Sequence, residues 1–225
     1  MSNNRAISGG LVVLLCALPT AAGAAVDTSR DDGRLQRRCR RAELPSDPLN
    51  ELERADRTIE GLLGRRVPEW SPEADAIKWE LDSILAGMLD YEQIARSSLG
   101  GDWDRLSTAQ RAAFLKALSG LTNRAFVSGI TRSDVQLRFG SETVLGAKAS
   151  VMVTATVSGT TADADQQIEY RLSQKQGRWL IYDVLVGGVG LVDRYHAQFA
   201  RLIQREGASG LIDRMQRKLE VSGRY

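Results

Sequence analysis

Residues 150–157 read Ser-Val-Met-Val-Thr-Ala-Thr-Val, and residues 168–172 read Ile-Glu-Tyr-Arg-Leu. In both stretches every second residue is apolar and faces the same way along an extended chain, which predicts two half-buried β-strands. The polar residues 158–165 between them predict a hairpin loop, and residues 175–178 predict a tighter turn. Together with a first strand over residues 135–139, these patterns predict an antiparallel sheet.

Residues 179–186, Trp-Leu-Ile-Tyr-Asp-Val-Leu-Val, depart from this alternation because they are apolar on nearly both faces. Such a strand is either central in its sheet or covered on its second side by something other than water. The sequence leaves both alternatives open.

Helical signals surround the strands on both sides. Ser46-Asp47-Pro48 and Ser71-Pro72 each combine a capping residue with a proline in the first turn, so they predict two helix starts. A third helix is predicted from Asp90 to Leu99, and Ser107-Thr108-Ala109-Gln110 is a capping box that begins a fourth. The helical period returns after Gly187-Gly188-Val189-Gly190, with one apolar stripe over residues 191–202 and another over residues 211–219, beyond Gly207 and Gly210. Helices, a strand meander and helices again predict an α+β fold, one domain over residues 46–225.

Composition excludes several classes of protein. The 225 residues contain 30 Lys+Arg against 28 Asp+Glu, a net charge of +2, so nothing indicates a nucleic-acid-binding field. Two cysteines and one histidine exclude most zinc, iron–sulfur and disulfide-rich proteins. We therefore expect no metal and no cofactor.

The N-terminus has the features of a secretory signal. Arg5 precedes the apolar run 11–18, Pro19 ends it, and Ala22-Gly23-Ala24 supplies small residues for cleavage, so residues 1–25 are predicted to be a signal peptide. The run is shorter than the roughly 20 residues that a membrane anchor needs. Residues 26–45 are Arg-rich and nearly without apolar residues, which predicts a flexible segment. Removal of Arg5 with the signal leaves 29 − 28 = +1 for residues 26–225.

Few residues suggest catalysis. The glycines at 187–190 lack the lysine and the spacing of phosphate-binding loops, so they more simply allow a close turn. His196, on the predicted last helix, is interpreted as a surface or boundary residue. Asp183 lies inside the apolar strand, so if buried it must be hydrogen-bonded or paired with a base such as Arg194 or with an indole. We favour this structural role over general-base catalysis.

Several longer segments resemble one known family. These are Leu89-Asp90-Tyr91-Glu92-Gln93-Ile94-Ala95, Leu99-Gly100 with Trp103, residues 108–114, Tyr170-Arg171-Leu172, residues 177–184 and residues 188–199. In this order they resemble the MlaC/Ttg2D family of periplasmic phospholipid-binding proteins over roughly residues 48–220. The chain departs from the family pattern at Gly190, where a serine is usual, at His196, where an arginine is usual, and in its Arg-rich segment.

The resemblance implies a fold and a function. The fold is a twisted antiparallel β-sheet wrapped by several α-helices that enclose an apolar lipid pocket. The function is carriage of phospholipid through the periplasm between an outer-membrane lipoprotein–porin complex and an inner-membrane ABC transporter with an MCE-domain ring, which maintains outer-membrane lipid asymmetry. Such a carrier is not an enzyme, and we expect a monomer.

The carrier hypothesis needs an apolar lining for the acyl chains. The predicted lipid-binding residues are Ile94, Leu99, Phe114, Leu118, Leu121, Val151, Val153, Tyr170, Ile181, Val184, Val189, Leu191, Tyr195 and Phe199. Two alternatives stay open: a periplasmic adaptor of the same fold without lipid cargo, and an α+β isomerase or hydrolase that uses Asp183 with His196.

Overall fold

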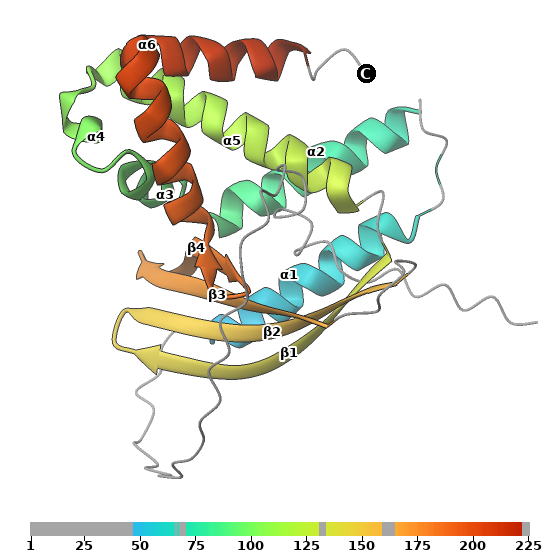
Figure 1. The fold of residues 1–225 in the computed structure, drawn as a ribbon. Coiled ribbons are helices and arrows are strands. Elements are labelled where there is room, and N and C mark those ends of the chain that lie inside the picture. The colour runs from blue at the N-terminus through green and yellow to red at the C-terminus, as the bar shows by residue number, and fades with distance from the viewer. Residues whose placement is uncertain (1–46, 66, 68–70, 131–133, 159–164, 222–225) are drawn as a thin grey trace, which may run out of the picture.

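The computed structural model describes residues 47–65, 67, 71–130, 134–158 and 165–221 (Figure 1). The predicted signal peptide and the Arg-rich segment lie outside these residues. Within them, no helix has both the length and the apolar character needed to cross a bilayer. The same residues contain no group of three or more His, Cys, Asp or Glu side chains that could hold a metal ion.

The strands form one antiparallel sheet in sequence order, as the alternating stretches predict. The strands are β1 (Asp134–Leu145), β2 (Lys148–Ser158), β3 (Gln166–Lys175), β4 (Arg178–Val186) and the short β5 (Val189–Gly190). The predicted tight turn joins β3 to β4, and Gln176 and Gly177 both have positive φ, as a two-residue hairpin turn of type I′ requires. β1 runs beyond the predicted residues 135–139 because a register shift between Phe139 and Glu142 lets pairing with β2 continue.

A bulge in β4 explains its apolar sequence. Tyr170 pairs with Val184 but Leu172 pairs with Ile181, so β4 has one extra residue in this interval. The bulge turns Ile181 and Val184 to the same face of the sheet. β4 is flanked by β3 on one side and by the two-residue β5 on the other, and Leu185 on its second face is buried.

The helices begin where local capping chemistry predicts. They are α1 (Pro48–Leu63), α2 (Pro72–Met88), α3 (Tyr91–Leu99), α4 (Asp102–Arg105), α5 (Thr108–Ile130) and α6 (Leu191–Val221), which is kinked at Gly207. Asp47, Ser71 and Asp90 accept hydrogen bonds from the first turns of α1, α2 and α3. The capping box before α5 forms in both directions. The Ser107 amide donates to Oε1 of Gln110 at 2.9 Å, and the Gln110 amide donates to Oγ of Ser107 at 3.2 Å. Only the short α4 was not predicted.

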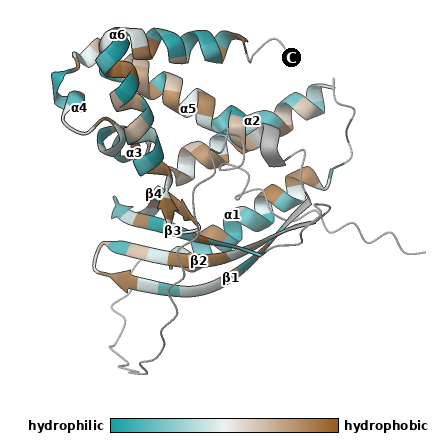
Figure 2. Cartoon of the chain, in the orientation of Figure 1, coloured by the Kyte–Doolittle hydropathy of each residue, from teal (hydrophilic) through white to brown (hydrophobic). Residues whose placement is uncertain are grey.

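The elements form two layers. The sheet is one layer and the helices are the other. α1 lies along the sheet, and α2, α3, α5 and α6 lie on the same side of the sheet as α1 (Figure 1). Hydrophobic residues predominate in β4, whereas much of α6 is hydrophilic (Figure 2). Phe199 of α6 packs edge-on against Phe114 of α5, with ring centroids 5.5 Å apart, and stacks on Tyr195 at 5.3 Å. The predicted α+β architecture is confirmed, with its core between the sheet and the helices.

Candidate functional site

Most of the predicted lipid-binding residues lie together in the core. Those that are buried are Ile94, Leu99, Phe114, Leu118, Val151, Val153, Tyr170, Ile181, Val184, Leu191 and Phe199. Leu121 and Tyr195 are half-buried and pack against this core. Val189 is different, because it lies in β5 with 47% of its surface exposed. The structure therefore brings together all of these side chains except Val189.

Two small cavities lie inside this core. One is lined mainly by apolar residues, including Ile94, Leu191 and Tyr195, and the other by residues that include Phe126 and Tyr170. Leu89, Ile181 and Val184 line both, so the cavities are neighbours. Each has a volume of about 10 Å³, which is room for about one water, whereas ligand pockets typically have about 300–1,000 Å³. The sheet and the helices are thus closed on each other.

The sequence prediction missed part of this lining. Leu85, Met88, Leu89 and Phe126 line the second cavity but were not among the predicted site residues. Leu85 and Met88 belong to the apolar stripe of α2, so the signal for them was helical spacing. Nothing in that spacing shows which stripe faces a cavity and which faces only other side chains.

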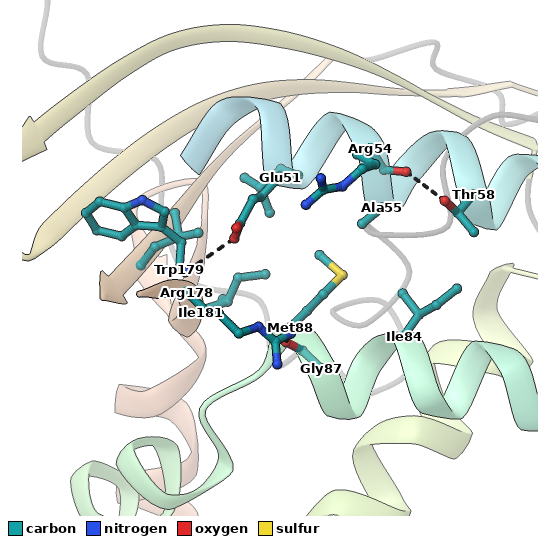
Figure 3. Close-up of a pocket in the computed structure, with 12 residues that line it drawn as sticks. Glu51, Arg54, Ala55, Thr58, Ile84, Gly87, Met88, Arg178, Trp179 and Ile181 are labelled. Atoms are coloured by element: carbon teal, nitrogen blue, oxygen red, sulfur yellow. Dashed lines mark hydrogen bonds between the residues drawn. The ribbon is translucent and has the colours of Figure 1, made fainter. Parts of the chain in front are cut away.

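A larger groove opens at the surface between α1 and α2, with a volume of about 220 Å³ (Figure 3). We call it the α1–α2 groove. It is lined by Glu51, Leu52, Arg54, Ala55, Thr58, Ile84, Gly87, Met88, Leu172, Arg178, Trp179 and Ile181. Buried apolar side chains of α1, β3 and β4 thus share the groove with charged ones from α1 and β4.

Two hydrogen bonds connect the walls of the groove. Arg178 at the start of β4 donates through Nη2 to the carbonyl oxygen of Gly87 near the end of α2, at 2.7 Å. The amide of Trp179 donates to Oε2 of Glu51 on α1, at 3.3 Å. The first residues of β4 therefore hold both helices.

Asp56 places a carboxyl group on the buried face of α1. The residue is 5% exposed, and its Oδ1 atom has no hydrogen-bond partner among the described residues. Burial raises the pKa of Asp56 to about 7, the negative charge of Glu60 adds to the shift, and Arg57 opposes it. The negative charge of Asp56 in turn contributes to a raised pKa of Tyr170, after burial as the larger cause.

Asp183 caps the last helix from a neighbouring strand. Its Oδ1 accepts from the amides of Val184, at 2.9 Å, and of Val192, at 3.1 Å, in the first turn of α6. Burial raises the pKa of Asp183, and these two backbone bonds oppose the rise. A Cβ at Gly190 would lie 2.9 Å from Oδ2 of Asp183. The glycine therefore leaves room for a carboxylate that supplies the cap which a serine hydroxyl could otherwise give.

The predicted pairing of Asp183 with His196 is not seen. Nδ1 of His196 lies 3.2 Å from the carbonyl oxygen of Ser98 at the end of α3, while Asp183 is engaged by backbone amides. The positive charge of Arg171, and not that of Arg194, opposes the raised pKa of Asp183. The arrangement matches the structural role that the sequence favoured.

Comparison with known proteins gives consistent matches. The family model described as MlaC protein matches residues 66–217. The intermembrane phospholipid transport system binding protein MlaC of Haemophilus influenzae is 22% identical over 135 residues, 59% of this chain. That match spans 63% of the relative's length, which is less than two thirds.

A solved structure has the same fold. The phospholipid-binding protein from Ralstonia solanacearum, in complex with a phospholipid, superposes with a TM-score of 0.60. The match covers 80% of this chain and 100% of that one, at 17% sequence identity. At this identity the likeness shows the fold.

Proposed function

The chain belongs to the MlaC protein family, and on this premise we propose that it is a phospholipid carrier that encloses acyl chains between its sheet and its helices. The observation that carries the proposal is the pair of neighbouring cavities between the sheet and the helices, which share Leu89, Ile181 and Val184. The names of the Haemophilus influenzae relative and the Ralstonia solanacearum structure, which refer to phospholipid transport and phospholipid binding, support it.

The energetics of acyl chains explain why a carrier needs such a core. Each buried CH₂ group is worth about 0.8 kcal/mol, so a chain of about 16 carbons represents on the order of 12 kcal/mol of exposure to water. A protein that moves such a chain through an aqueous compartment must cover it. The phosphate, in contrast, stays near water because burial of a charge is costly.

Lipid entry requires the layers to separate. The two cavities of about 10 Å³ are each too small for an acyl chain, so enclosure of a chain moves the apolar side chains around them apart. On loading, the tails replace contacts between the sheet and the helices with contacts of similar apolar character.

The proposed setting is the periplasm. Residues 1–25 direct export, and the mature monomer then moves phospholipid between an outer-membrane lipoprotein–porin complex and an inner-membrane MCE-type ABC transporter. This traffic maintains the lipid asymmetry of the outer membrane. The proposal gives the chain no catalytic step and no cofactor, and phospholipid is its cargo.

Native mass spectrometry of the exported protein, purified without detergent, tests the proposal. We expect a stoichiometric phospholipid adduct, which lipid extraction then identifies. A mass without adduct, in a protein that also takes up no lipid from phospholipid vesicles, refutes lipid carriage.

One observation favours a second candidate function. The small volume of the core cavities also suits a periplasmic adaptor that has the fold but no cargo. Such an adaptor purifies without lipid and still binds a membrane complex. A pull-down with the exported protein from solubilised membranes, run beside the mass measurement, separates the two.

A further inference from the structure

Two arginines that are distant in the sequence face the same groove. Arg54 lies on α1 and Arg178 at the start of β4, and both line the α1–α2 groove (Figure 3). Among the described residues, the guanidinium group of Arg54 forms no hydrogen bond or ion pair, and Arg178 donates to a carbonyl oxygen and not to a carboxylate. Both cations are therefore available to an anion in the groove.

The groove leads toward the core. Met88 and Ile181 line both the α1–α2 groove and the core cavity that contains Tyr170 and Phe126. Met88 is half-buried, and the unbranched methionine side chain changes rotamer easily. A molecule with one end at the arginines therefore has its other end directed at the apolar core, past the side chains of Met88 and Ile181.

The charges of the groove fit one kind of headgroup. We propose that the α1–α2 groove is the headgroup end of the lipid site, where Arg54 and Arg178 bind the phosphodiester of a zwitterionic phospholipid. Guanidinium groups bind phosphate oxygens with strong, charge-assisted hydrogen bonds. Glu51 lies in the same groove, so a headgroup that carries an amine beside its phosphate meets an opposite charge, and one with a second negative charge is repelled.

This assignment rests on the proposed function but adds to it the place of entry and the headgroup class. Both arginines are exposed, so the phosphate keeps contact with water while the tails pass Met88. That geometry satisfies the need to cover the tails without burying the charge.

The test separates headgroup recognition from tail binding. The exported protein is incubated with vesicles that contain phosphatidylethanolamine and a diacylglycerol with identical acyl chains, and native mass spectrometry gives the ratio of the two adducts. Arg54→Glu is the main variant and Arg54→Gln the milder one. Arg57→Glu is the matched control, because Arg57 lies on the same helix and pairs at the exposed surface with Glu53.

We expect the wild type to prefer the phospholipid and Arg54→Glu to reduce the adduct ratio about tenfold, with a smaller reduction for Arg54→Gln. Arg57→Glu keeps the wild-type ratio, and inorganic phosphate competes only weakly because it lacks tails. If Arg54→Glu keeps the wild-type preference, or if Arg57→Glu lowers it equally, the headgroup assignment is wrong while lipid carriage stands. If the wild type takes up neither lipid, the proposed function itself fails.

Discussion

Replacement of Asp56 by asparagine removes a buried group that titrates near neutral pH. The pKa of Asp56 is raised from 3.8 to about 7 in the folded protein, so the folded chain holds this proton more tightly than the unfolded chain does. The free energy of unfolding must then decrease as the pH rises from about 4 to about 7, and stay level above. A shift of about three units, at about 1.4 kcal/mol per unit, gives a decrease of up to about 4 kcal/mol.

The expected result is a flatter pH profile for Asp56→Asn. At pH 4.5 the variant should be more stable than the wild type by only about 1 kcal/mol, because the carboxyl group is still neutral in the folded chain but already ionised in much of the unfolded chain. At pH 8 the variant should be more stable by about 2–4 kcal/mol, since it avoids an uncompensated buried charge. Burial also raises the pKa of Asp82 and of Asp183, so part of the wild-type slope remains.

Urea unfolding followed by tryptophan fluorescence, at several pH values between 4.5 and 8, measures the effect. Asp213→Asn serves as the control, because Asp213 lies on the exposed side of α6. The reasoning is refuted if Asp56→Asn has the same pH slope as the wild type, or if Asp213→Asn flattens the slope as much.

Four further variants test the core and the last helix. Leu118→Trp or Val153→Trp fills space between the layers, so lipid adducts should disappear in native mass spectra while circular dichroism shows an intact fold; a folded variant with full occupancy contradicts this pocket. Gly190→Ala places a methyl group 2.9 Å from Oδ2 of Asp183, which should displace the cap and cost about 1 kcal/mol, and an unchanged melting temperature contradicts it. Phe199→Ala removes both aromatic contacts of this ring and should lower the free energy of unfolding by about 3–5 kcal/mol in urea titrations, whereas a loss below 1 kcal/mol excludes a core role.

Local chemistry made much of the fold predictable. Asp47, Ser71 and Asp90 cap their helices through contacts within three residues, so neighbours in the sequence determine them. The turn at Gln176 and Gly177 is equally local. Such features are readable because no distant part of the chain is needed to form them.

Features that depend on distant segments were not predictable. The bulge in β4 shifts the alternation of side chains by one residue after Ile181, so a different set of residues faces the core from there on. Only the pairing of β4 with β3 shows this shift. Val189 was among the predicted lipid-binding residues, yet its place in β5 leaves it at the surface. The juxtaposition of Arg54 with Arg178 requires the complete fold.

The buried carboxyl group of Asp56 was predictable only in part. It lies between Leu52 and Ile59 at helical spacing, so the sequence contained the signal for a carboxyl group on the buried face of α1. Periodicity indicates the face, but the absence of a partner for Oδ1 in the described part of the chain appears only in the structure.

The cap on α6 ties the start of this helix to the sheet. Val192 cannot move away from β4 without loss of its hydrogen bond to the buried Asp183. Across the α1–α2 groove, the bond of Arg178 to Gly87 is exposed to water, and that of Trp179 to Glu51 is longer, at 3.3 Å. In hydrogen-exchange experiments the amide of Val192 should therefore stay protected under conditions in which those of α1 already exchange.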